Sequence, residues 1–294
     1  MAHIHKHNSK NLLVVFVLTV LYMIAEYLGG LYTNSLALIA DAGHMLGDVG
    51  ALGLSFFALW ISKKPAPIDR TFGYFRAEII AAFINGIALV AIAVAIFFEA
   101  YSRIIYIQKV SPLIMIFIAT GGLIVNIIGV FMLHQGSKEN LNIKGAFLHI
   151  IGDLLGSIGA IIAGLLIYYK DFYLADPIIS IIIASFVLYS SINLILSTLQ
   201  IFMEAAPKHI DIKKIKEQIL NINNVEAIHD LHVWSISSNY ISLSVHVVSN
   251  FQNNEQILHE INNLLIEKFN ILHSTIQIEP KDFHEHCCPF NHQD

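Results

Sequence analysis

Charged residues and cysteines are scarce in this sequence, and it has no basic patch. Asp, Glu, Lys and Arg form 13% of the 294 residues, while 55% are hydrophobic. Soluble domains carry about 25% charged residues, so this composition excludes an ordinary soluble protein. The formal net charge is −5, which argues against a nucleic-acid partner. We therefore expect a lipid bilayer around much of the chain and no nucleic acid.

The chain contains 2 cysteines, Cys287 and Cys288, which are adjacent and lie close to its C-terminal end. Neighbouring cysteines rarely form a relaxed disulfide, and several histidines lie beside this pair. We expect reduced thiols that face a metal ion rather than a structural bridge.

Six apolar segments are each long enough to cross a bilayer, which requires about 20 mostly apolar residues. They cover residues 11–31, 35–61, 77–104, 113–134, 143–169 and 175–202. Prolines fall at or near the ends of these segments, where a helix tolerates them. The sequence therefore predicts an α-helical membrane domain with six transmembrane helices.

This pattern divides the chain into four parts. We expect a His-containing N-terminal tail (1–10), the transmembrane domain (11–205), a soluble domain (206–280) and a His- and Cys-rich C-terminal tail (281–294). Lysine and arginine gather on the short loops of one side, which is typical of the cytoplasmic side. We therefore expect a multi-pass membrane protein with both termini in the cytoplasm. By analogy, the short loops and the compact soluble domain favour a bacterial inner membrane.

The soluble domain shows the order αββαβ. Helical periodicity occurs in residues 210–222 and 254–269, and strand-like alternation in 225–237, 240–248 and 273–279. This order predicts an α+β domain whose helices pack on one face of a three-stranded sheet.

Two matched motifs lie inside the apolar segments: His44-x-x-x-Asp48 and His149-x-x-x-Asp153. Residues four apart share one face of a helix, so each motif presents an imidazole and a carboxylate together. Two such helices that face each other supply two nitrogens and two oxygens, a tetrahedral ligand set for Zn²⁺. Ionisable side chains at membrane depth are costly and are functional by default. The sequence therefore predicts a metal site at these four residues.

Metal ions and protons compete for the same ligand atoms, because a ligand must lose its proton to bind metal. Such competition is the physical basis of a metal/proton antiporter. A polar residue that merely packs between helices is the alternative for any one of the four, but it does not explain two matched pairs.

Other polar residues in the apolar segments have weaker patterns. Asp41 lies one turn before His44 and could orient its ring, although solvation of the helix end explains it nearly as well. Glu26 and Asn126 fit hydrogen bonds between helices better than the lining of a wet cavity.

Four segments resemble the motifs of the cation diffusion facilitator family. They are residues 41–48 (DAGHMLGD), 72–78 (FGYFRAE), 149–153 (HIIGD) and 229–234 (HDLHVW). The resemblance covers residues 11–280. It implies a homodimeric divalent-cation/proton antiporter with a ferredoxin-like, metallochaperone-like cytoplasmic domain. The His-Asp/His-Asp set resembles the zinc-transporting branch, and Co²⁺ and Cd²⁺ stay open as further cargo.

The resemblance also implies metal ligands in the cytoplasmic part. These are His229, His246, His273 and Glu279, with Cys287 and Cys288 as the nearest match to a cysteine pair of relatives. His232 is expected to be a strand residue that points away from this site. A further expected pair joins Arg76 to Glu204 after the sixth helix, with a solvated arginine as the alternative.

We thus expect a zinc/proton antiporter that exports Zn²⁺ from the cytosol by alternating access, with Zn²⁺ as both transported and regulatory ion. An intramembrane metallohydrolase is an alternative, but it needs an open coordination position, and the sequence has no His-Glu-x-x-His motif. We therefore expect no enzyme. The other alternative is a membrane metal sensor, in which only the cytoplasmic ligands would be essential.

Overall fold

The computed structural model describes residues 2–62, 64–137, 141–238, 240–250 and 253–281. Residues 1–55 and 84–195 form one compact unit, and residues 56–83 and 196–294 form a second. The first unit contains most of the apolar helices, and the second contains the α/β domain.

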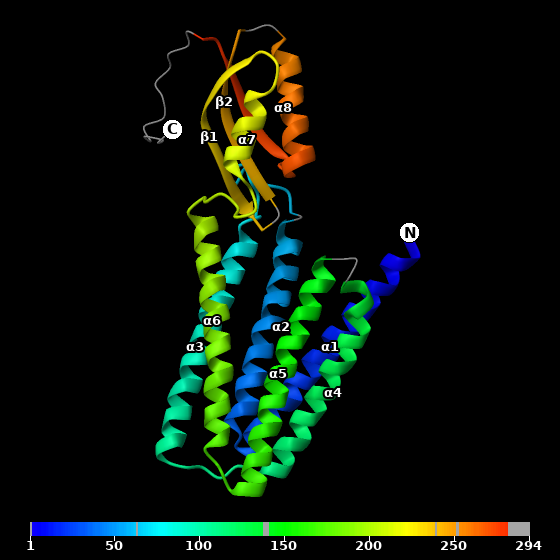
Figure 1. Ribbon diagram of the computed structural model, residues 1–294, viewed down its shortest axis with the longest axis vertical. Coiled ribbons are helices and arrows are strands. Elements are labelled where there is room, and N and C mark those ends of the chain that lie inside the picture. The colour runs from blue at the N-terminus through cyan, green and yellow to red at the C-terminus, as the bar shows by residue number, and fades with distance from the viewer. Residues whose placement is uncertain (1, 63, 138–140, 239, 251–252, 282–294) are drawn as a thin grey trace. The chain divides into compact units, whose positions relative to one another are not determined.

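Six long helices account for the six predicted apolar segments (Figure 1). They are α1 (Ala2–Thr33), α2 (Leu36–Ser62), α3 (Ala77–Ile105), α4 (Pro112–Ser137), α5 (Leu141–Lys170) and α6 (Ala175–Phe202). Among the described residues, five of these helices contain a stretch long and apolar enough to cross a membrane, and α2 contains a shorter apolar stretch, Leu36–Gly47. The predicted helical membrane domain is confirmed.

The first helix begins earlier than the sequence pattern indicates. Residues 2–10 are the first residues of α1. No proline or glycine separates this polar stretch from the apolar segment, so nothing in it forces the helix to begin later.

Helix α2 lies in the middle of the membrane part, because it contributes to two separate buried clusters. One cluster joins α2 to α3 and α6 through Leu36, Ala40, Leu89, Ala93, Ile96, Ala100, Ile183, Ala184 and Val187. The other joins α2 to α4 and α5 through Ala37, Leu38, Met115, Ala119, Ala160, Ala163 and Ile167. Both contacts contain several alanines, whose small side chains allow the close backbone approach that drives helix association in lipid.

The α/β domain has the predicted order. Its elements are α7 (Ile212–Leu220), β1 (Val225–Ser237), β2 (Tyr240–Ser249), α8 (Asn254–Phe269) and β3 (His273–Glu279). The sheet order is β1-β2-β3, with β1 antiparallel and β3 parallel to β2.

Both helices of this domain pack on one face of the sheet. A single core joins Ile215 and Ile219 of α7 and Ile257 and Ile261 of α8 to alternate strand residues such as Val245. Alternate residues of a strand point to opposite faces, so the neighbouring position His246 lies on the face without helices. The predicted arrangement of helices on one face of a three-stranded sheet is confirmed.

The second unit also contains the loop between α2 and α3. Phe75 of this loop stacks on Tyr240 of β2, with ring centroids 4.9 Å apart. Arg76 Nη2 donates to Glu204 Oε1 at 2.9 Å, so the predicted pair is confirmed. Both side chains are largely exposed, and such a pair contributes only about 0–1 kcal/mol to stability.

Candidate metal sites

The structure brings two of the four predicted membrane ligands together. His44 Nε2 of α2 lies 3.5 Å from Asp153 Oδ1 of α5. Asp153 is buried, and His44 is partly exposed. An imidazole and a carboxylate from different helices therefore meet inside the apolar bundle.

The other two predicted ligands lie in the same helices, but their side chains are outside the described part of the structure. Asp48 follows His44 by one turn in α2, and His149 precedes Asp153 by one turn in α5. The helical repeat places each of them on the same helix face as its partner.

The contacts between α2 and α5 follow one antiparallel order. Ala37 and Leu38 share a cluster with Ala160, Ala163 and Ile167. Further along α2, Asp41 lies against Gly156, and His44 then lies against Asp153. As the residue number rises along α2, it falls along α5.

Asp41 is buried in α2, where it lies against α5. Its carboxyl group lies so close to Gly156 of α5 that a Cβ there would overlap it. Because Gly156 has no side chain, α5 leaves room for the buried Asp41 carboxyl group.

Glu26 fits the predicted role in contacts between helices. Its Oε1 accepts from the Tyr22 hydroxyl at 3.1 Å, and that hydroxyl lies 3.0 Å from the Ile118 carbonyl oxygen of α4. Buried polar groups in lipid need such partners. Glu26 therefore belongs to a polar contact that joins α1 to α4 through Tyr22.

The Gly156→Ala variant is expected to lower the rate of metal transport by about tenfold. Mutating a residue that supports a metal ligand typically causes a loss of this size. The new methyl group would displace the Asp41 carboxylate, which has little free space because it is buried. The matched control is Gly53→Ala on α2, since a Cβ at Gly53 has nothing within 4 Å. Transport rates of purified protein in vesicles decide this, and equal rates for both variants would contradict the packing argument.

A second candidate site lies on the helix-free face of the α/β domain. His229 of β1 pairs in register with His246 of β2. His229 Nε2 lies 3.0 Å from Glu279 Oε2, and His246 Nδ1 lies 2.6 Å from Glu279 Oε1. One ligand atom from each of the three residues lies within 4.8 Å of the others. Three ligands of these types suit a divalent metal such as Zn²⁺.

Asp230 lies beside the group of His229, His246 and Glu279, and the sequence analysis did not predict it as part of this site. Its Oδ2 lies 3.8 Å from His246 Nε2, and its Oδ1 lies 2.9 Å from His232 Nε2. Its φ is +52°, and the pairing of β1 with β2 is irregular between His229 and His232. This bulge changes the alternation of side chains, which is why His232 connects to the site through Asp230 instead of pointing away from it.

His273 is not part of this group, in contrast to the expectation from the resemblance. It pairs with Ser242, four positions before His246 on β2, which is a separation of about 13 Å along a strand. Its ring instead lies 6.2 Å from Tyr240 and 5.8 Å from Phe72, measured between centroids. The two other predicted ligands, Cys287 and Cys288, lie outside the described residues.

Comparisons with known proteins cover nearly the whole chain. A family model described as the cation efflux transmembrane domain matches residues 12–203. A second, for the cytoplasmic domain of cation efflux proteins, matches residues 207–281 and implies dimerization.

Individual relatives agree with these matches. The cadmium, cobalt and zinc/H⁺-K⁺ antiporter of Bacillus subtilis (strain 168) is 43% identical over 294 residues, covering 97% of this chain and 94% of that protein. The zinc transporter ZitB of Escherichia coli (strain K12) is 39% identical over 303 residues, covering 99% and 96%. The solved metal-bound C-terminal domain of the CzcD transporter from Cupriavidus metallidurans is 42% identical, with a TM-score of 0.23, over 24% of this chain and 99% of that one.

These matches extend over both the membrane part and the α/β domain, and they join the chain to transporters rather than enzymes. The chain is a multi-pass membrane protein that belongs to the cation efflux family, also known as the cation diffusion facilitators, in the group that includes CzcD and ZitB.

Proposed function

We propose that this protein exports Zn²⁺ from the cytosol in exchange for protons, with Co²⁺ and Cd²⁺ as further possible cargo. The contact between His44 and Asp153 carries the proposal. Two ligand atoms bound to one zinc ion at about 2.0–2.1 Å in tetrahedral geometry are about 3.3 Å apart. The observed separation of His44 Nε2 and Asp153 Oδ1 is 3.5 Å, so one ion fits both atoms with little movement.

The order of contacts between α2 and α5 supports Asp48 and His149 as the other two ligands. Asp41 faces Gly156 and His44 faces Asp153, so one further turn of antiparallel packing brings residue 48 of α2 level with residue 149 of α5. The proposed site is then His₂Asp₂. A complete tetrahedral set has no open position for a catalytic water, which disfavours the metallohydrolase alternative.

The transport cycle follows from competition at these four residues. In the inward-facing state, deprotonated ligands take Zn²⁺ from the cytosol, and the cation offsets the burial of two carboxylates. When the site faces the other side, protons displace the ion. Zn²⁺ is released only where protons bind, and protons are released only where Zn²⁺ binds, which is the requirement for exchange.

The α/β domain is proposed to bind regulatory Zn²⁺ through His229, His246 and Glu279. The His/Glu group on the helix-free face of the sheet supports this assignment. We further propose that the protein is a homodimer of the bacterial inner membrane, with domains at 11–205 and 206–280 and both termini in the cytoplasm. A bound ion in the α/β domains of both protomers would then tune transport.

Purified protein in vesicles tests the exchange directly. A zinc gradient across the vesicle membrane is expected to drive proton movement in the opposite direction, recorded with a pH-sensitive dye inside. A protonophore should abolish the pH signal and leave zinc uptake measurable. Zinc uptake without any coupled proton movement would contradict the antiport proposal.

The Glu279→Gln variant is expected to weaken zinc binding by the α/β domain by at least about tenfold, because it removes the charged oxygen ligands that face both histidines. Zinc titration against a competing chelator measures this. The matched control is Glu267→Gln, since Glu267 is exposed on α8. An unchanged affinity would contradict the assignment. A pure metal sensor would lose its function in Glu279→Gln and keep it when Asp153 is replaced.

A further inference from the structure

An apolar groove lies between α1, α2 and α3, and neither His44 nor Asp153 lines it. Its volume is about 620 Å³, within the range of about 300–1,000 Å³ that is usual for ligand-binding pockets. All residues that line it are apolar except Tyr27, Glu99 and Arg103. An ion or a chain of water molecules needs polar partners, so these walls suit a hydrocarbon chain better than a path for metal ions.

The groove has the length of one membrane leaflet. Along α2 it extends from Leu36 to Leu46, over which a helix rises about 15 Å. Half of the hydrocarbon core of a bilayer is also about 15 Å thick. At the Leu46 end, α2 and α3 come close together, since a Cβ on Gly43 would lie 3.0 Å from Ile92 Cγ2. One acyl chain of a single leaflet therefore matches the groove in length.

The side chains at the rim of the groove are accessible from the bilayer. Tyr27 and Leu28 of α1 are 49% and 58% exposed, and Leu46 of α2 is 49% exposed. With both termini in the cytoplasm, as proposed above, α2 begins on the outer side of the membrane. The groove then opens to the outer leaflet, with Leu36 and Arg103 at its outer end.

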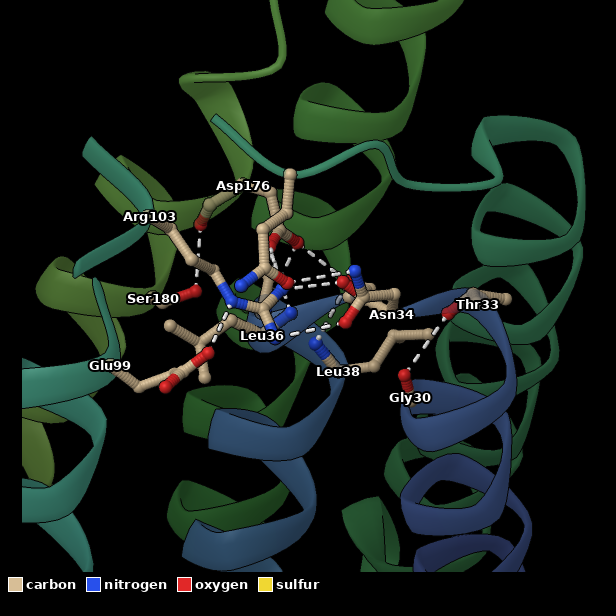
Figure 2. A network of polar contacts seen from close by, with 12 residues as sticks. Gly30, Thr33, Asn34, Leu36, Leu38, Glu99, Arg103, Asp176 and Ser180 are labelled. Carbon is tan, nitrogen blue, oxygen red and sulfur yellow. Dashed lines mark hydrogen bonds and ion pairs between the residues drawn. The ribbon is translucent and has the colours of Figure 1, made fainter. Parts of the chain in front are cut away.

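This outer end adjoins a buried polar network around Asp176 of α6 (Figure 2). Arg103 Nε donates to Glu99 Oε1 at 2.9 Å, and Arg103 Nη1 lies 3.6 Å from Asp176 Oδ2. Arg103 Nη1 also donates to the Asn34 carbonyl oxygen. Asp176 itself accepts from the Ser35 hydroxyl at 2.6 Å and from two amides of the first turn of α2. Protein groups therefore surround the guanidinium group and hold it in place.

Glu99 is the accessible charge at the outer end of the groove. Its side chain is 44% exposed, whereas those of Arg103 and Asp176 are 7% and 0% exposed. Two carboxylates thus lie beside a single guanidinium group, which leaves one negative charge in excess. An ammonium group that reaches Glu99 would offset this charge and donate a charge-assisted hydrogen bond.

Glu99 also lies at the depth of a lipid headgroup. Helix α3 has 29 residues and is about 43 Å long, which is close to the thickness of a bilayer with its headgroups, about 40–45 Å. Glu99 comes six positions before the end of α3, or about 9 Å along its axis. Its carboxylate therefore lies near the boundary between the hydrocarbon core and the headgroups.

We propose that this groove binds one acyl chain of a phosphatidylethanolamine of the outer leaflet, and that the ammonium group of the lipid donates to Glu99. Phosphatidylcholine has the same net charge, but its methylated nitrogen has no N–H donor, and phosphatidylglycerol has no cation. The groove therefore distinguishes these lipids by their headgroups. The choice of leaflet depends on the proposed orientation, whereas the binding itself does not depend on zinc/proton exchange.

Photolabelling in vesicles tests the acyl-chain site. The purified protein is reconstituted with a trace of phosphatidylethanolamine that has a diazirine in its acyl chain, and mass spectrometry maps the labelled peptides. We expect the label to concentrate on groove residues such as Tyr27 and Leu28. Ala95→Trp fills the groove and should remove most of this label, and the smaller change Ala95→Leu should remove part of it.

The matched control for these changes is Val94→Trp. Val94 is the neighbour of Ala95 on α3 and is 40% exposed, but it does not line the groove. The control should leave the labelling of Tyr27 and Leu28 unchanged. A label spread evenly over the lipid-facing helices, or one that neither change at Ala95 reduces, would overturn the proposal.

Competition between unlabelled lipids tests the headgroup. In vesicles that mix phosphatidylethanolamine and phosphatidylcholine with the same acyl chains, the first lipid should displace the label about fivefold more strongly, as expected for a hydrogen bond to a charged group. Glu99→Gln keeps an oxygen for Arg103 Nε but should abolish this preference. The matched control is Asp171→Asn, in the exposed loop before α6, which should keep it. Equal displacement by both lipids, or a preference that Glu99→Gln leaves intact, would overturn the proposal.

Discussion

The Asp153→Asn variant is expected to reduce zinc transport by at least about 100-fold. This loss is larger than the loss typical of mutating a residue that only hydrogen-bonds to a metal ligand. Asparagine has nearly the same shape as aspartate, but it lacks the negative charge that offsets the cation, and it does not take up or release the exchanged proton. Asp153 is buried and faces His44 across the α2–α5 contact, so solvent does not replace the missing charge.

Initial rates of zinc uptake into vesicles, normalised to the amount of folded protein, measure this effect. Asp171→Asn is the matched control, because Asp171 is exposed and has a φ of +53°, a conformation that asparagine tolerates. The control should transport normally. Uptake by Asp153→Asn within a few-fold of the unmodified protein would contradict the assignment of Asp153 as a ligand.

The His44→Asp variant is expected to change which metal is transported. Replacing an imidazole by a carboxylate makes the ligand set harder, and hard oxygen ligands suit Mn²⁺ better than nitrogen ligands do. We expect the Mn²⁺ to Zn²⁺ rate ratio to rise by about tenfold or more. Cd²⁺ uptake should persist, since cadmium accepts either ligand set.

Competition between metals in the vesicle assay measures this ratio. His209→Asp is the control, because His209 is exposed ahead of α7 and lies in neither candidate site. It should leave the ratio unchanged. If His44→Asp still transports zinc with an unchanged Mn²⁺ to Zn²⁺ rate ratio, His44 is not a ligand of the transported ion.

The sequence predicted most of the fold because its elements follow simple periodic patterns. The apolar segments end at prolines, glycines and charges, and all six are helices in the structure. Strand alternation and one hydrophobic helix face likewise predicted β1, β2, β3 and α8 within about one residue at each end. Assigned helix and strand ends differ by about this much between methods.

The residues of the candidate sites could be predicted only where their spacing along one helix shows that they share a face of that helix. His44 and Asp153 share a repeated His-x-x-x-Asp pattern, and the structure brings them to 3.5 Å. Asp230 joins the second site through a positive φ and a bulge, which no periodic pattern reveals. His273 has a suitable side chain, but the register of β3 places it opposite Ser242 and away from His246.

The network around Asp176 depends on contacts between residues far apart in the chain. Ser35 and Asp176 are separated by 141 positions, and neither has a local pattern that indicates the other. A buried acid at the beginning of one helix can complement the first turn of another only when the bundle is assembled. This is the kind of relation that a single sequence conceals.

Binding of Co²⁺ to the membrane site tests most directly whether α2 and α5 hold one ion together. The sample is a variant from which the cytoplasmic candidate ligands are removed by His229→Ala, His246→Ala, His273→Ala, Glu279→Gln, Cys287→Ser and Cys288→Ser, and visible absorption reports the geometry of bound Co²⁺. We predict the intense bands of a tetrahedral ion, lost when either His44→Ala or Asp153→Asn is added. Tetrahedral bands that survive both of these single changes would contradict a metal site shared between the two helices.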